Sequence, residues 1–166
     1  FHSLNVTTLP ATLIEGQLFG TDKGIATGVT SKLGFIRQFE GGTLVLDEIG
    51  ELHPSLQVKL LAVIEDHLVT PVGAFKPVKT NVRFLCATNQ DLERLVAAGR
   101  FRGDLFYRIN CARIHVPPLR ERPDDIMPLV AYICRQKGFK ITLTDDAIRA
   151  LSSYPWPGNY REVHNV

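Results

Sequence analysis

Apolar residues alternate along the chain between short continuous runs and helix-spaced positions. Residues 43–49 (TLVLDEI) form a continuous apolar run that carries two acids near its end, which is typical of a strand buried on both faces. Leu56, Leu60, Leu61 and Ile64 follow at helical spacing, which predicts an amphipathic helix beginning near Pro54. The pattern over residues 43–64 therefore predicts a strand followed directly by a helix.

The same alternation continues over the next fifty or so residues. Residues 69–82 are rich in Val, Pro, Gly and Lys and predict a hairpin or a long loop. Residues 81–87 (NVRFLCA) predict a second buried strand, 92–98 a short helix ending at Gly99, and 112–116 a third strand. Strands that alternate with helices predict a parallel α/β sheet flanked by helices.

After Leu119 the pattern becomes wholly helical. Asp124 and Asp125 predict the cap of a helix that runs to about Lys137 and ends at Gly138. Thr144 predicts the cap of a second helix, and PWPGN (155–159) a turn into a third, with Trp156 anchoring a small core. We therefore expect an α/β subdomain over residues 1–117 and a helical subdomain over 118–166.

Composition excludes few classes of protein. The 166 residues are 45% hydrophobic and 22% charged, which are ordinary globular values, and a net charge of +2 gives no argument for a nucleic-acid surface. Cys86, Cys111 and Cys134 stand apart in apolar surroundings, so we expect reduced, buried thiols in a cytoplasmic protein. No apolar run has the length of a membrane span, and we expect no membrane contact.

The strongest candidate for chemistry is the acid pair Asp47-Glu48 at the end of the first strand. Ligands of open parallel sheets bind beyond the carboxyl ends of the strands. One carboxylate there suits Mg²⁺, and the other can orient or deprotonate a water. Asn89 follows the second strand and is expected at the same edge. The plainer alternative is an acidic helix start and a turn-forming asparagine.

Arginines are concentrated in GRFRGDLFYR (99–108). Arg100, Arg102 and Arg108 are either solvated side chains or groups that stabilise phosphoryl charge, the latter across a subunit interface. Arg161, at the start of the last helix, is alone either a surface residue or a partner of Glu162. The phosphate-binding pattern GxxxxGK[ST] does not occur in the sequence; the glycine-rich segment 20–28 lacks its lysine and hydroxyl.

Seven segments stand together in an order that resembles the AAA+ domain of sigma-54-dependent transcriptional activators. They are GQLFG, GGTLVLDEIGEL, QVKLLAVIED, VRFLCATNQDL, GRFRGDLFYRI, PPLRERPDDI and WPGNYREV, and the resemblance extends over nearly the whole chain, residues 1–166. The resemblance implies a P-loop NTPase sheet followed by a helical lid. It also implies that ATP and Mg²⁺ are the ligands.

The resemblance assigns roles to individual residues. It implies that Asp47 and Glu48 are the Walker B pair, with Asp47 on Mg²⁺ and Glu48 activating water, and that Asn5 is the switch partner of Glu48. Asn89 falls at the sensor I position and contacts nucleotide. Three arginines complete the set: Arg102 and Arg108 act in trans on the neighbouring subunit's nucleotide, and Arg161 is the sensor II residue of the lid.

The resemblance also implies partners: copies of the same chain in a ring, usually a hexamer, and RNA polymerase holding sigma-54. DNA would be bound only by a domain outside this sequence. The sequence departs from the family pattern at two places, and both bear on these expectations. The family's Walker A loop precedes the match to FHSLN, so we expect a chain truncated at both ends that does not hydrolyse ATP alone. The sigma-contacting motif GAFTGA reads here Gly24, Ile25, Ala26, Thr27, Gly28, Val29, with alanine in the aromatic position.

Two alternatives to an ATPase that remodels sigma-54 polymerase stay open from the sequence. One is a non-catalytic AAA+ module that regulates or oligomerises without engaging sigma-54, favoured by Ala26 and by the missing Walker A loop. The acids and arginines argue against it. The other is an ATPase that acts on a polymerase without sigma-54.

Overall fold

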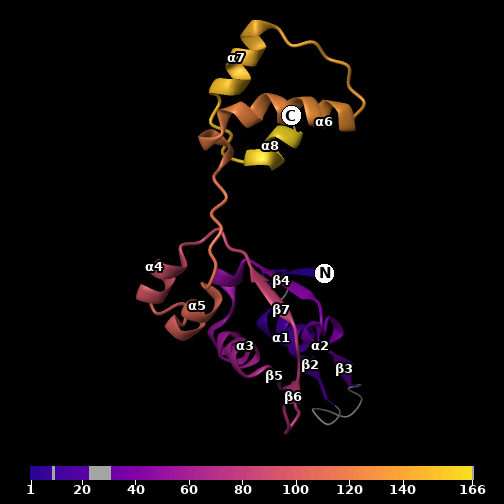
Figure 1. Ribbon diagram of the computed structural model, residues 1–166, viewed down its shortest axis with the longest axis vertical. Coiled ribbons are helices and arrows are strands. Elements are labelled where there is room, and N and C mark those ends of the chain that lie inside the picture. The colour runs from indigo at the N-terminus through magenta and orange to yellow at the C-terminus, as the bar shows by residue number, and fades with distance from the viewer. Residues whose placement is uncertain (9, 23–30, 166) are drawn as a thin grey trace. The chain divides into compact units, whose positions relative to one another are not determined.

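The computed structural model describes residues 1–8, 10–22 and 31–165, which fall into two compact units, Phe1–Arg113 and Ile114–Val166 (Figure 1). Each unit is built around its own hydrophobic cluster. None of the helices in these described ranges is long and apolar enough to cross a membrane.

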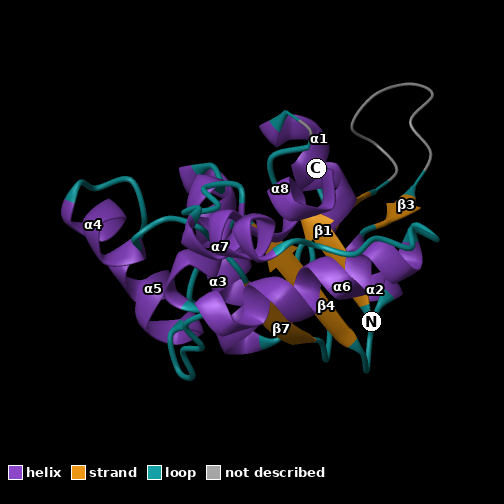
Figure 2. Ribbon diagram, turned by 90° about the horizontal axis from the view of Figure 1, so that it is seen from above, coloured by secondary structure: helices purple, strands orange, loops and turns teal. Residues whose placement is uncertain are grey.

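A parallel sheet organises the first unit. Its strands are β1 (His2–Asn5), β4 (Thr43–Asp47) and β7 (Arg83–Cys86), and β4 lies between the other two (Figure 2). In the register Asn5 pairs with Asp47, and Leu46 pairs with Cys86. The strands predicted in residues 43–49 and 81–87 and their parallel pairing are confirmed.

Helices bury one face of this sheet. Leu44 and Leu46 of β4 are completely buried, together with Leu60 of α3 (Pro54–Asp66) and Leu105 of α5 (Gly103–Ile109). Helix α3 begins where predicted, with Pro54 in its first turn and the His53 ring accepting the Ser55 amide. The remaining helices of the unit are α1 (Ala11–Phe19), α2 (Phe35–Gln38), the short η1 (Ile49–Glu51) and α4 (Leu92–Ala97), which ends before Gly99 as predicted.

The other face of the sheet departs from the prediction. In β7 Arg83 is exposed and Leu85 is 42% exposed, so the expectation of a strand buried on both faces is wrong for β7. Arg83 and Leu85 alternate with Phe84 and Cys86 along this end strand, so they lie on the face opposite the core. Its inner residues, Phe84 and Cys86, pack against the core, and burial raises the pKa of the Cys86 thiol to about 12.

Two antiparallel pairs project from this layer. β5 (Leu68–Val69) pairs with β6 (Val78–Lys79), which confirms the hairpin reading of residues 69–82. β2 (Gly20–Thr21) pairs with β3 (Lys32–Leu33) on either side of residues 23–30. The approach of Gly34 to this pair is so close that a Cβ on Gly34 would lie 2.3 Å from the Gly20 nitrogen and 2.4 Å from the Leu18 oxygen. Only glycine fits there.

The predicted third strand, 112–116, is wrong. These residues form no ladder with any described strand, and the side chains of Ile114 and Val116 are 87% and 73% exposed. The alternation of apolar and polar residues is present, but a strand needs a hydrogen-bonding neighbour, and the described residues place none beside this segment. The segment contains the division between the two units.

The second unit is helical, as predicted. Its helices are α6 (Ile126–Gln136), α7 (Asp145–Ser153) and α8 (Asn159–Asn165), preceded by the short η2 (Leu119–Glu121) and η3 (Pro123–Asp125). Trp156 is buried in its core, and the indole N–H donates to the Leu151 carbonyl at 2.9 Å, so its anchoring role is confirmed. Thr144 caps α7 through the Ala147 amide, also as predicted.

Two smaller expectations are wrong. Asp125 makes no side-chain cap of α6, because its carboxylate pairs with Arg122 at 3.2 Å while residues 123–125 form a 3₁₀ turn. The three cysteines are unpaired, but Cys111 is exposed rather than buried, since it lies just beyond the end of α5 with its thiol near the Arg108 carbonyl.

Candidate functional site

The ends of β1 and β4 bring two of the predicted site residues together. Asn5 and Asp47 are register partners at the carboxyl ends of adjacent parallel strands, and the Val6 amide donates to the Asp47 carbonyl at 3.0 Å. The Asp47 side chain is half-buried, and its Oδ1 accepts the Glu48 amide at 3.0 Å. Asp47 is therefore fixed at the edge where ligands of parallel sheets bind.

Glu48 adopts a left-handed backbone conformation, with φ of 57°. Few residues other than glycine do so, and such conformations gather at functional sites, where the surroundings enforce them. Here the constraint is visible on both sides: β4 pairs with β1 and β7 before Glu48, and the Ile49 amide donates to the Ala87 carbonyl directly after it. The sharp turn lifts the Glu48 side chain out of the strand at the sheet edge.

Asn89 reaches the same edge from β7. The backbone nitrogen of Asn89 lies 3.4 Å from Glu48 Oε2, a weak contact that places the two residues side by side. Its own side chain is exposed. The structure thus brings together Asp47, Glu48 and Asn89 as the sequence predicted, with Asn5 at the neighbouring strand end.

The Asn5 side chain points to its own turn. Its Oδ1 accepts from the Thr7 amide at 2.8 Å and from the Thr7 hydroxyl at 2.7 Å. Asn5 is therefore at the predicted edge, but its side chain is engaged with Thr7 rather than with Glu48. A pocket of about 500 Å³ opens beside this turn, with Thr7, Glu51 and Arg100 among the residues of its wall.

The Asp47 carboxylate at this edge is of the oxygen-donor type that hard cations such as magnesium prefer. No group of three or more His, Cys, Asp or Glu residues is arranged to hold a metal within residues 1–8, 10–22 and 31–165. A magnesium ion needs no such cage, because it keeps several waters and binds through one or two carboxylates and substrate phosphates. Asp47 accepts the Glu48 amide through Oδ1, which leaves its Oδ2 as a candidate ligand for such an ion.

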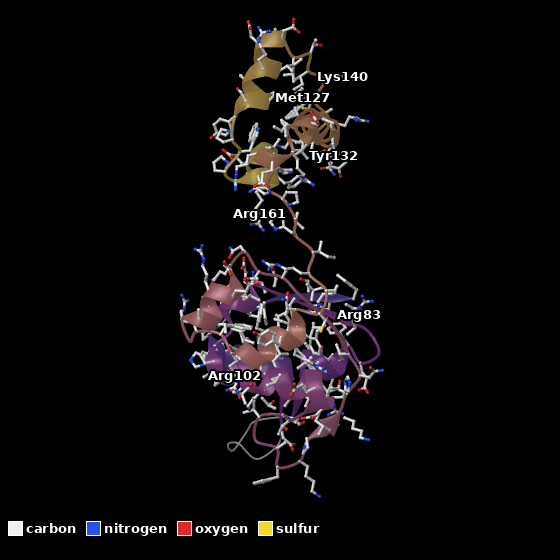
Figure 3. The ribbon with its side chains drawn as sticks, turned by 60° about the vertical axis from the view of Figure 1, so that its left-hand side comes forward. Arg83, Arg102, Met127, Tyr132, Lys140 and Arg161 are labelled. Carbon is white, nitrogen blue, oxygen red and sulfur yellow. The ribbon has the colours of Figure 1, made fainter. Side chains whose placement is uncertain are left out.

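The two trans-arginine candidates differ in their surroundings. Arg102, labelled in Figure 3, forms a two-pronged contact with Asp104, with Nε at 3.0 Å from Oδ1 and an amino nitrogen at 2.7 Å from Oδ2. The hydrogen bonds raise the pKa of the Arg102 guanidinium and hold the pKa of the Asp104 carboxyl below its ordinary value. Arg108 is exposed near the end of α5 and forms no ion pair with any described residue.

Arg161 lies on α8 of the second unit (Figure 3), where it is exposed. The structure does not show the alternative interpretation, in which Arg161 pairs with Glu162. The Glu162 carboxylate accepts the Tyr154 hydroxyl at 3.1 Å and the Gly158 amide at 2.8 Å instead. The segment Gly24, Ile25, Ala26, Thr27, Gly28, Val29 lies outside the described residues.

One polar residue at the centre of the first unit escaped the sequence reasoning. Gln57 of α3 is completely buried, and its side chain bonds to Leu52, Arg100 and Arg102. A signal was present: positions 57, 60, 61 and 64 have the i, i+3, i+4, i+7 spacing of a helix face, and three of them are apolar. A glutamine in the first position of such a face indicates a buried group with partners.

A parallel sheet with acids at its carboxyl edge, followed in the chain by a helical unit, agrees with an AAA+ domain and its lid. The chain belongs to the sigma-54 interaction domain family: residues 1–115 match that family, and residues 120–166 match the AAA+ ATPase lid domain. The prediction of family and fold from the sequence is confirmed.

Relatives agree with this assignment. The chain is 49% identical over 170 residues to the Nif-specific regulatory protein of Azotobacter vinelandii, a match that covers 99% of this chain and 33% of that protein. It is 44% identical to the DNA-binding transcriptional regulator NtrC of Salmonella typhimurium, covering 100% of this chain and 37% of NtrC. The chain thus spans about a third of the length of these relatives.

Solved structures of NtrX are also similar to this chain. NtrX from Brucella abortus in complex with ADP has a TM-score of 0.89 and 36% identity, covering 99% of this chain and 37% of NtrX. The ATP complex of NtrX has a TM-score of 0.88 and 34% identity, over 98% of this chain and 38% of that one.

Proposed function

We propose that this chain is part of the ATP-hydrolysing domain of a cytoplasmic sigma-54-dependent transcriptional regulator. The observation that carries the proposal is the joint placement of Asp47, Glu48 and Asn89 at one sheet edge, with Glu48 held in a left-handed turn. The whole protein would carry the phosphate-binding loop that this sequence lacks, assemble into a ring, and contact DNA through a separate domain. Its target would be RNA polymerase holding sigma-54.

In this proposal each acid has one task. Asp47 would hold a magnesium ion, which would neutralise charge on the phosphate oxygens. Glu48 accepts a proton from the attacking water. At the same time the water oxygen bonds to the γ-phosphorus, and the bond between that phosphorus and ADP breaks. Asn89 orients the water or a γ-phosphate oxygen. The Asn5 side chain leaves Thr7 and hydrogen-bonds to Glu48 when the bound nucleotide changes between ATP and ADP.

The arginines would complete the site from other parts of the assembly. We propose that Arg108, and Arg102 once released from Asp104, stabilise phosphoryl charge on the neighbouring subunit's nucleotide. Arg161 would reach nucleotide from the lid. These roles would make hydrolysis depend on the ring, because a lone subunit has no neighbour to supply its arginines.

The test is MgATP turnover by the full-length protein, measured over a range of protein concentrations and followed by open-complex formation at a sigma-54 promoter. We expect turnover per subunit to rise as the ring forms, and open complexes to require ATP. A non-catalytic AAA+ module, the alternative that Ala26 favours, would assemble and bind partners without turnover at any concentration.

The loop substitution provides a separate prediction about the partner. Burial of a phenylalanine side chain in place of the Ala26 methyl contributes about 1.5–3 kcal/mol. We therefore expect Ala26→Phe to tighten binding to sigma-54 polymerase about 10- to 100-fold, with ATP turnover unchanged. The measurement is polymerase binding by the full-length protein with trapped nucleotide.

Ile25→Phe is the matched control, because it adds the same ring one position away. Equal binding by all three proteins would mean that the segment 24–29 does not contact sigma-54. The second alternative, an ATPase acting on a polymerase without sigma-54, would then gain support.

A further inference from the structure

Gln57 connects two segments that belong to different parts of the proposed chemistry. Its Nε2 donates to the Leu52 carbonyl at 2.7 Å and to the Arg100 carbonyl at 3.1 Å, and its Oε1 accepts the Arg102 amide at 2.8 Å. Leu52 follows Glu48 by four residues, whereas Arg100 and Arg102 lead into α5. A single side chain thus bridges the exit of the acidic strand and the start of the arginine-bearing helix.

The orientation of this amide is determined by its partners. Two of them are carbonyl oxygens, which need donors, and the third is an N–H, which needs an acceptor. A flipped amide would set a donor against the Arg102 N–H and an acceptor against two oxygens. Because Gln57 is completely buried, its removal would leave the Leu52 carbonyl, the Arg100 carbonyl and the Arg102 amide without this partner.

The start of α5 has few other polar ties. The Arg100 and Phe101 amides donate to the Leu95 carbonyl of α4, and among the described residues the Arg102 side chain bonds only to Asp104, within its own turn. The Arg102 amide itself is held by Gln57 alone among the described residues. Gln57 is therefore the polar link between α3 and the start of α5, in addition to the apolar packing of the two helices in the core.

We infer that Gln57 is a positioning residue that aligns Arg102 and Arg108 for the neighbouring subunit's nucleotide, through its bonds to residues 100 and 102. The inference rests on the proposed function, in which these arginines act in trans. Gln57 touches neither substrate nor cofactor. Its loss would displace the start of α5 and, with it, both guanidinium groups, while leaving the acids of its own subunit in place.

The variant that tests this is Gln57→Met, which keeps the length and volume of the side chain and removes all three hydrogen bonds. In the full-length protein we expect kcat for ATP to fall about 10- to 100-fold, the cost of a misplacement near 1 Å, with KM changed by less than about threefold. Gln136→Met is the matched control, since it removes one exposed glutamine contact, to Tyr132, in the second unit. We expect it to leave turnover unchanged.

Mixed rings separate positioning from a merely structural role. In a ring of Gln57→Met and Glu48→Gln subunits, some Gln57→Met subunits have intact acids and receive well-placed arginines from a Glu48→Gln neighbour. We expect such mixtures to recover turnover that neither variant has alone. A structural role of Gln57 within its own subunit would give no recovery, and that result would overturn the inference.

Amide exchange tests the link without relying on turnover. We expect the Arg102 amide to exchange at least about tenfold faster in Gln57→Met than in the parent protein, with core amides of β4 unchanged. Equal exchange would overturn the inference. If Gln57→Met does not fold, Gln57→Glu carries the turnover and mixed-ring tests, because it loses both donations; it keeps an acceptor for the Arg102 amide, so that amide is expected to exchange as in the parent protein. Absence of turnover in the parent protein would count against the proposed function, whereas normal turnover in Gln57→Met would count against the inference alone.

Discussion

Replacement of Glu48 by glutamine is expected to abolish nearly all ATP turnover while nucleotide still binds. A positioned general base contributes about 10²- to 10⁴-fold to rate, and the amide cannot accept the proton of the attacking water. The substitution is close to isosteric, and its oxygen can still accept the weak contact from the Asn89 amide. The left-handed turn at residue 48 is enforced by its neighbours in the sheet, so we expect the backbone to keep its shape.

The measurement is steady-state MgATP turnover of the full-length protein beside the dissociation constant for nucleotide. Glu51→Gln is the matched control. Glu51 lies in the same turn, and in the described part of the chain its carboxylate accepts a hydrogen bond only from the side-chain amide of Gln90. We expect that control to stay within about twofold of the parent protein, since an exposed hydrogen bond contributes little. Comparable losses in both variants would show that the turn, and not the Glu48 carboxylate, is what turnover needs.

The acidic edge could be predicted from the sequence because three kinds of information coincided there. A continuous apolar run fixes β4, acids at its end fix the edge, and a second run ending in Thr88-Asn89 fixes the neighbouring strand. The parallel arrangement then follows from the alternation with helices. What the pattern does not contain is the side-chain detail: Asn5 turned toward Thr7, and Arg102 clasped by Asp104, depend on local geometry that hydrophobic periodicity does not carry.

The failures have physical causes of the same kind. Residues 112–116 have the alternation of a strand, yet pairing needs a partner that sequence periodicity does not supply. Asp125 has the composition of a cap, but Arg122 takes its carboxylate. Gln57 was visible as one polar residue on an apolar helix face, and its significance depends on Leu52 and on residues 100–102, which lie on other segments. Local patterns predict elements; contacts between distant segments decide what their polar residues do.

The unequal surroundings of the two arginines lead to the largest predicted effect. Arg108 is exposed and unpaired within the described residues, so its guanidinium is available to a neighbouring subunit without breaking any contact. Arg102 must first leave Asp104. An arginine that stabilises phosphoryl charge is worth about 10³- to 10⁵-fold in kcat, and we expect Arg108→Ala to lose turnover in that range, more than Arg102→Ala.

The check on Arg108→Ala is turnover in mixed rings, with Arg113→Ala as the control. Arg113 is an exposed arginine whose guanidinium pairs with Glu93 at 3.1 Å in the same unit, and its removal should change turnover by less than about twofold. If Arg108 acts in trans, mixing Arg108→Ala with Glu48→Gln subunits restores a fraction of the sites, because an intact acid then faces an intact arginine. An arginine acting on its own subunit's nucleotide would leave every such mixture inactive, since each site would lack one of the two groups. Arg108→Lys separates charge from shape: the ammonium keeps the charge but not the planar fork, so a near-complete loss with lysine would mean that the guanidinium holds two phosphoryl oxygens at once.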